Sequence, residues 1–160
     1  PDDPPFLYHW MFFWGLLAGG VGFLLARQYR KEQARKWRVL LGLHSAFIGS
    51  SFGFMGVLIL LAWIFTDHVV MAHNENLFFT NPATFLLLPL GLMFAWGSQR
   101  AKRWLPMLWI GLCGIGILGV LVKPLPWFDQ HNYLTMVMCV TMLGLMAAAS
   151  KMFLLEEKAE

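Results

Sequence analysis

Charged residues are scarce in this chain of 160 residues: Asp, Glu, Lys and Arg make up 13% of it, whereas hydrophobic residues make up 58%. Soluble domains average about 25% charged residues. A soluble fold of this size would still leave about a third of its surface facing water, and this composition cannot cover so large a surface with polar groups. The scarcity of charge therefore excludes a soluble globular domain and favours a protein whose solvent is lipid.

The sequence also lacks the usual signs of an active site. Its two cysteines, Cys113 and Cys139, each lie near the middle of a long apolar run, where a thiol is usually inert. No Gly-rich phosphate loop is present, and no Ser, His and Asp can be assembled at one depth of a membrane. No acidic residue or lysine lies deep in a predicted helix, which disfavours an ion-coupled transporter. We therefore expect neither a self-sufficient catalytic site nor a cofactor.

Five apolar segments are long enough to cross a bilayer, whose hydrocarbon core of about 30 Å needs about 20 helical residues. The five segments cover residues 6–26, 39–65, 83–97, 104–122 and 133–155. In the third segment, Asn81 and Pro82 should open the helix as an N-cap followed by proline at the first helical position, and Pro89 should kink it. The sequence predicts an all-α integral membrane protein, a bundle of about five transmembrane helices.

The basic residues lie almost entirely on one side of these predicted helices. Eleven of the twelve Lys and Arg residues fall in segments 27–38, 98–103 and 151–158, and Lys123 alone falls on the other side. This distribution follows the positive-inside rule, so we expect the N-terminus to lie outside and the C-terminus in the cytoplasm. It also accounts for the formal net charge of +3 without nucleic acid as a partner.

The predicted domain organisation follows from this topology. Residues 1–5, which are rich in Pro and Asp, form a stiff extracytoplasmic linker into the membrane region. Residues 6–155 form the transmembrane domain, and residues 156–160 form a cytoplasmic tail.

Small residues form a narrow stripe on each of the first two predicted helices. The stripes include Gly15, Gly19 and Gly22 on the first helix, and Gly42, Gly49 and Gly53 on the second. Such stripes let helix backbones approach closely where lipid gives no hydrophobic drive for association. We therefore expect the first two helices to form a tight antiparallel hairpin through these stripes.

Histidines and carboxylates gather on the predicted outer side. They are His9, His68, His73, His131, Asp67, Glu75 and Asp129. Imidazole with carboxylate suits zinc, copper or iron, but the spacing matches no tight ligand motif, so we favour ordinary polar loops over a metal site. His44 is the one clearly intramembrane histidine, and we expect it to hydrogen-bond a neighbouring helix or to reach the interface.

The connection at residues 65–82 is the most informative segment, because it mixes polar side chains with Phe, Leu and Met. Its candidate site residues are Asp67, His68, His73, Asn74, Asn76 and Asn81. Asn and Asp side chains can cap helices and bond backbone groups, so one interpretation is a structured connection that plugs the helix ends. The other interpretation is a surface that binds lipid headgroups or a partner.

Part of this connection carries a motif. It reads Thr66-x-His68, five residues, Asn74-x-Asn76-Leu77, and then Asn81-Pro82. Over these 17 residues the chain resembles the membrane part of the bacterial Lnb-type lipoprotein N-acyltransferases. Members of this family carry an extracytoplasmic papain-like domain followed by several transmembrane helices. The resemblance implies a multi-pass protein of the bacterial cytoplasmic (inner) membrane.

The resemblance also implies where the chemistry resides. The family's nucleophilic cysteine and histidine belong to the papain-like domain, and the two intramembrane cysteines of this chain cannot replace them, since a reactive cysteine needs a thiolate and access. The leading hypothesis is a membrane-anchoring and substrate-presenting module that works with lipoprotein or phospholipid and with an upstream extracytoplasmic domain. The alternative is a non-catalytic small subunit of a larger complex, held to other membrane subunits through its glycine stripes and its Trp-rich surface.

Overall fold

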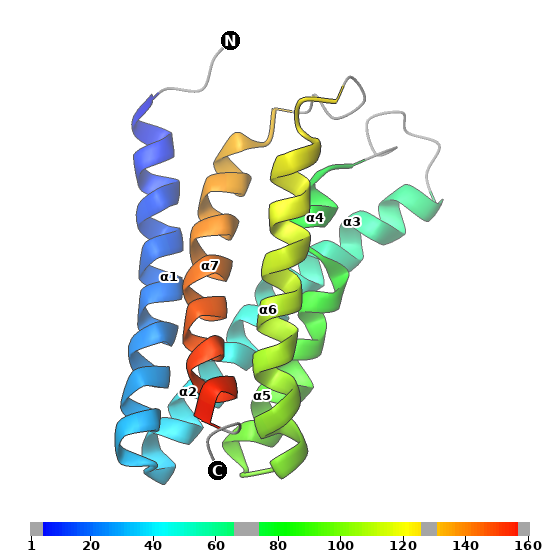
Figure 1. Cartoon of the computed structure of the whole chain (residues 1–160). Helices are drawn as coiled ribbons and strands as arrows, with labels where there is room; N and C mark the ends of the chain where they lie inside the picture. The colour runs from blue at the N-terminus through cyan, green and yellow to red at the C-terminus, as the bar shows by residue number, and fades with distance from the viewer. Residues whose placement is uncertain (1–4, 66–73, 126–130, 157–160) are drawn as a thin grey trace.

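The computed structural model describes residues 5–65, 74–125 and 131–156, and the regular secondary structure of this part is helical (Figure 1). Five helical segments of this part are long and apolar enough to cross a membrane. The first is α1 (Pro5–Glu32), the fourth α6 (Gln99–Val122) and the fifth α7 (Tyr133–Glu156). The second joins α2 (Arg35–Ile48), the π-helical turn η1 (Gly49–Gly53) and α3 (Phe54–Phe65). The third joins α4 (Asn76–Phe79), the 3-10 helix η3 (Pro82–Leu86) and α5 (Leu87–Ala95). The prediction of an all-helical chain with five such segments is confirmed.

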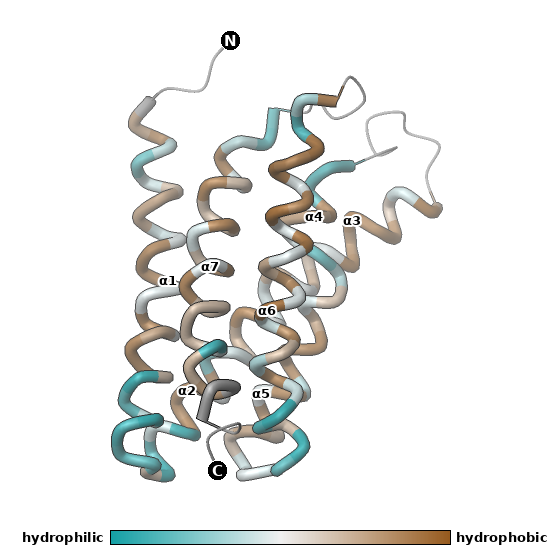
Figure 2. The backbone as a smooth tube through the Cα atoms, viewed as in Figure 1, coloured by the Kyte–Doolittle hydropathy of each residue, from teal (hydrophilic) through white to brown (hydrophobic). Residues whose placement is uncertain are grey.

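The two ends of the bundle differ in polarity (Figure 2). We call one the basic end; it holds the α1–α2 turn and the start of α6. We call the other the N-terminal end; it holds the start of α1, the α4 region, the end of α6 and the start of α7. Apolar residues dominate the helices between the two ends (Figure 2).

Several helices extend beyond the apolar runs that predict them. α1 continues through Glu32 and α2 begins at Arg35, so the predicted basic loop 27–38 is mostly helical. The turn between them is short: Gln33 has a φ of 50°, and its backbone N–H donates to the Tyr29 carbonyl at 2.7 Å. The apolar run marks only the stretch that suits hydrocarbon, whereas the helix itself continues into its charged ends.

The third span is built in pieces. α4 precedes the predicted start at residue 83, and η3 then opens at Pro82, with Asn81 as its N-cap as the sequence predicts. Pro89 lies in the first turn of α5, directly after the change from 3-10 to α-helix. A proline in a first turn costs no helical hydrogen bond, so the irregularity of this span lies before Pro89 and not at it.

The helices α1, α7, α6, α5 and α2 are neighbours in that order, and α2 closes the ring against α1. The core inside the ring is apolar and includes Ala26, Leu41, Trp109 and Met146, each at most 4% exposed. This core lies in the half of the bundle nearer the basic end, because all five spans meet there.

The expected pairing of the two glycine stripes is wrong. The stripe of α1 faces α7: a Cβ on Gly15 would meet the Met138 carbonyl, and one on Gly19 would lie 2.9 Å from the Met142 Cα. Gly22 faces the Met146 sulfur of α7 and the His44 ring of α2.

The glycines of the second span face the third span instead. A Cβ on Gly42 would lie 2.5 Å from the Gly91 carbonyl oxygen, and one on Gly49 would lie 2.5 Å from the Leu88 nitrogen. A Cβ on Gly53 would meet the backbone of Phe85. Each stripe therefore permits a close contact, as small residues do in membranes, but with a different helix from the one expected.

The second span changes direction at the π-helical turn η1. Within it the Ser50 hydroxyl donates to the Phe47 carbonyl at 2.9 Å, a back-bond of the kind that bends helices. Beyond the turn, α3 packs on η3 and α4, and Gly56 faces the Thr80 carbonyl. As a result α3 leans away from α1 and α7 toward the N-terminal end (Figure 1). The ring of helices is closed near the basic end and open near the other.

Candidate functional site

A compact polar segment, Asn74 to Asn81, lies at the N-terminal end, and we call it the α4 segment. The Asn74 side-chain oxygen accepts from the Asn76 N–H at 3.0 Å, and the Thr80 hydroxyl donates to the Asn76 carbonyl at 2.9 Å. Asn81 bonds in two directions: its oxygen accepts from the Ala83 N–H at 2.8 Å, and its amide nitrogen donates to the Leu77 carbonyl at 3.1 Å. Asn81 is thus the N-cap of η3, as the sequence predicts, whereas Asn74 forms a local turn directly before Glu75, the N-cap of α4.

A buried ion pair ties the α4 segment to the rest of the bundle. Glu75 pairs with Lys123, which directly follows α6, and their side chains are only 2% and 9% exposed. The Lys123 ammonium also lies 4.8 Å from the centroid of the Tyr133 ring at the start of α7. A buried charge without a partner is strongly destabilising, so this pair binds α4, α6 and α7 to one another.

The predicted site residues fall into two groups. Asn74, Asn76 and Asn81 lie together in the α4 segment. Asp67, His68 and His73 lie outside the described residues.

Sequence reasoning did not single out Lys123 for the site. The sequence does indicate a partner for these carboxylates, because Lys123 is the one basic residue on the predicted side where they gather. Asn132 was also missed: it is 7% exposed, and both polar atoms of its amide lack a hydrogen-bond partner within the described residues.

A lateral groove opens beside the α4 segment, between the second span and α7. Its volume is about 410 Å³, and the residues that line it are Ser51, Phe52, Met55, Ile59, Asn76, Thr80, Thr135 and Met138. It occupies the place where α3 leans away from the other helices. Ligand pockets commonly measure about 300–1,000 Å³, so the groove is large enough to hold a small ligand.

Three polar side chains on this groove lack hydrogen bonds to the described protein. The Asn76 side-chain oxygen is buried without a partner, and no bond is formed by the Ser51 or Thr135 hydroxyls among the described residues. Other hydroxyls of α7 behave differently from Thr135: Thr141 donates to the Val137 carbonyl and Ser150 to the Met146 carbonyl, both at 2.8 Å. The groove therefore gathers hydrogen-bonding capacity that the helices themselves leave unused.

A second groove, between the third span and α6, provides a contrast. Its volume is about 630 Å³, and it is lined by apolar residues such as Leu90, Met107, Leu108 and Ile115. It has no counterpart to Asn76, Ser51 or Thr135. Its surface is of the kind expected wherever helices face hydrocarbon.

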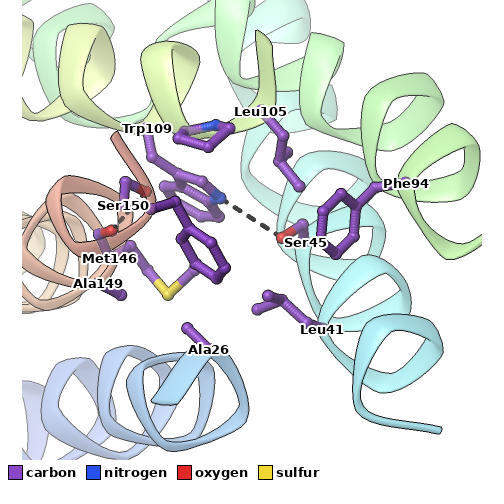
Figure 3. Close-up of a pocket in the computed structure, with 11 residues that line it drawn as sticks. Ala26, Leu41, Ser45, Phe94, Leu105, Trp109, Met146, Ala149 and Ser150 are labelled. Atoms are coloured by element: carbon purple, nitrogen blue, oxygen red, sulfur yellow. Dashed lines mark hydrogen bonds between the residues drawn. The ribbon is translucent and has the colours of Figure 1, made fainter. Parts of the chain in front are cut away.

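A small cavity of about 20 Å³ lies in the core of the bundle (Figure 3). The Trp109 indole N–H points across it and donates to the Ser45 hydroxyl at 3.4 Å (Figure 3). A cavity needs about 10–15 Å³ to hold one water, so this one admits a single water and nothing larger. It is a packing feature of the closed half of the bundle.

The described histidines and cysteines are dispersed. His9 and His131 are exposed. The His44 ring packs against Gly22 of α1, and its Nε2 is buried without a hydrogen-bond partner among the described residues, so the expected hydrogen bond to a neighbouring helix stays a prediction. Cys139 is fully buried and Cys113 is partly buried, both as free thiols. Within the described ranges, no group of three or more His, Cys, Asp or Glu could hold a metal ion, and His68 and His73 fall outside these ranges.

Comparison with known proteins gives one match. No curated protein and no solved structure matches the chain. The family model described as the Lnb transmembrane domain matches residues 5–158, nearly the whole chain, and this confirms the resemblance that the Asn-rich motif suggests. The match covers all five spans and both grooves, so the chain belongs to the Lnb transmembrane domain family.

Proposed function

We propose that this chain is the membrane-anchoring and substrate-presenting module of a lipoprotein N-acyltransferase-like protein, whose chemistry is carried by a domain outside this chain. The observation that carries the proposal is the α4 segment. It contains the Asn74-x-Asn76-Leu77 and Asn81 part of the family motif, it is held by the side-chain hydrogen bonds of Asn74 and Asn81, and the Glu75–Lys123 pair fastens it to α6. A segment held in this way offers a firm surface at the end of the bundle.

The proposal includes an orientation in the bacterial cytoplasmic membrane. The N-terminal end faces outward and the basic end faces the cytoplasm, because Lys and Arg are retained on the cytoplasmic side. The α4 segment then lies at the outer surface, where lipoproteins are acylated. Lipoprotein or phospholipid would approach it from the outer leaflet.

The test is a pair of cap variants in the protein in its native membrane. Asn81→Ala removes the side-chain bonds to Ala83 and Leu77 and loosens the α4 segment. Ser98→Ala is the matched control, because it removes the N-cap bond to Ala101 at the basic end. Loss of an N-cap costs about 0.5–2 kcal/mol, so both variants should fold.

Mass spectrometry of the N-terminal lipopeptides of lipoproteins measures the outcome. With equal amounts of protein in the membrane, Asn81→Ala should lower the N-acylated fraction, and Ser98→Ala should leave it unchanged. Equal acylation in both variants and in the unaltered protein would contradict the proposal. Co-purification of other membrane subunits in fixed ratio, together with unchanged acylation, would instead support a subunit of a larger complex.

A further inference from the structure

We propose that the groove between α3 and α7 binds one phospholipid of the surrounding bilayer. One acyl chain lies against Phe52, Met55, Ile59 and Met138, and an ester of the glycerol backbone is hydrogen-bonded at Asn76. This inference concerns a ligand of the groove and does not depend on the acyltransferase role proposed above.

The position of the groove along the spans suits a lipid. Asn76 begins the third candidate span, Asn76–Ala95, and Thr135 lies near the start of the fifth, Tyr133–Phe153. Span ends lie at the boundary between hydrocarbon and headgroups, which is also where the ester groups of a phospholipid lie. Met55, Ile59 and Met138 continue from there into the apolar interior of the spans.

The polar groups of the groove suit an ester. A side-chain amide offers a donor at one atom and an acceptor at the other, and the hydroxyls of Ser51 and Thr135 offer further donors. An ester accepts hydrogen bonds through its carbonyl oxygen. The Asn76 amide nitrogen and the two hydroxyls can donate to that carbonyl. The buried Asn76 side-chain oxygen is itself an acceptor, so it takes a donor from the headgroup, such as a hydroxyl of phosphatidylglycerol or the ammonium of phosphatidylethanolamine. Unsatisfied polar groups are costly in a bilayer, which holds no water to replace the missing bonds, so a phospholipid here would relieve that cost.

The size of the groove argues against a protein segment as its occupant. A helix with its side chains is about 10–12 Å across and rises about 5.4 Å per turn, so 410 Å³ matches only about one turn of helix. One turn is too short to be a stable helical partner. A single extended hydrocarbon chain fits the same space without backbone groups that would need hydrogen bonds.

The second groove provides the internal control. It is larger, at about 630 Å³, but it has no side chain equivalent to Asn76 at its rim. Lipid chains that merely coat the protein should contact both grooves alike. A bound phospholipid should favour the groove that holds Asn76.

The experiment uses the protein purified from its native membrane and reconstituted into vesicles of phosphatidylethanolamine and phosphatidylglycerol. The probe is phosphatidylglycerol with a diazirine in one acyl chain, and labelled peptides are quantified by mass spectrometry. We expect labelling at Met55 and Met138 to exceed labelling at Met107 and Leu108. Excess unlabelled phosphatidylglycerol should abolish the difference.

Two groove variants and one control complete the design. Asn76→Leu removes the amide and should lower labelling at Met138 about tenfold, the effect of one lost hydrogen bond. Thr135→Phe fills the groove and should reduce labelling to the level of the second groove. Gly111→Phe places a ring in the second groove, where a Cβ meets no atom within 4 Å, and should leave labelling at Met138 unchanged.

Unfolding temperatures of all three variants separate loss of the lipid from loss of the fold. Equal labelling of the two grooves, or labelling of Met138 that survives both Asn76→Leu and Thr135→Phe in folded protein, would overturn the proposal. Displacement of the probe by a diacylated lipopeptide but not by phospholipid would also overturn it, because the groove would then belong to a lipoprotein. These readouts need no acylation assay, so failure here leaves the proposed function standing, and failure there leaves the lipid site standing.

Discussion

Adjacent glycines on α1 allow a direct test of the packing between α1 and α7. A Cβ on Gly19 would lie 2.9 Å from both the Cα and the carbonyl oxygen of Met142, whereas a Cβ on Gly20 would meet no atom within 4 Å. We predict that Gly19→Ala destabilises the protein and that Gly20→Ala stabilises it, although the two substitutions are chemically identical and lie one residue apart.

The magnitudes follow from two opposing effects. Alanine is favoured over glycine in a helix by up to about 1 kcal/mol, and both variants gain this. Gly19→Ala also crowds the backbone of α7, which cannot rotate away as a side-chain end can, and overpacking of this kind costs about 1–3 kcal/mol. The free energies of unfolding of the two variants should therefore differ by about 1–3 kcal/mol.

Unfolding in one detergent, followed by tryptophan fluorescence, measures the difference. Crosslinking adds a geometric check: a Gly19→Cys and Met142→Cys pair should crosslink, and a Gly19→Cys and Gly49→Cys pair should not. Equal stability of the two alanine variants, together with a crosslink between positions 19 and 49, would refute the α1–α7 contact and restore the pairing of the two glycine stripes.

Three further predictions concern other parts of the molecule. Glu75→Leu or Lys123→Met alone should cost about 3–5 kcal/mol, because each removes one partner of a buried ion pair, and the double variant should recover most of this; chemical unfolding of the three variants checks it. Gly97→Ala should lower the unfolding temperature, since Gly97 has a φ of 93°, which alanine rarely adopts; Gly114→Ala, which meets no atom within 4 Å, should not. In protein without other cysteines, Leu125→Cys should react with an impermeant maleimide in intact cells, and Gln33→Cys only after permeabilisation; the reverse pattern would invert the proposed orientation.

The number of spans was predictable from the sequence because lipid imposes a simple rule. The backbone N–H and C=O groups of a span must form their hydrogen bonds within the span, and its side chains must be apolar. The composition of about 20 consecutive residues therefore predicts whether they cross the membrane. The glycine stripes were visible for a similar reason. A stripe such as Gly42, Gly49 and Gly53 predicts that the backbone of another helix packs closely against it. Glycine has no side chain that would select one helix over another, so the sequence does not predict which helix this is.

The candidate site was predictable only where local chemistry decides the structure. Asn81 before Pro82 predicts a cap, because both residues act on their own neighbours in the chain. The pairing of Glu75 with Lys123 joins residues 48 positions apart, and nothing local identifies it. The groove could not be predicted either, because it depends on how α3 leans away from α7, and no local sequence pattern identifies that arrangement.

The π-helical turn at Gly49–Gly53 has a consequence for insertions and deletions in this domain. A π-turn holds about one residue more than an α-turn, and each residue advances a helix by about 100°. Removal of one residue there would leave the second span long enough to cross the membrane and as apolar as before. Because the turn would then be an ordinary α-turn, Met55 and Ile59 would keep about the same rotation relative to α2. Removal of one residue from a regular α-helical part of the same span would instead rotate every residue beyond it by about 100°. The π-helical turn is therefore the place in the second span where a change of length by one residue disturbs the orientation of the groove residues least.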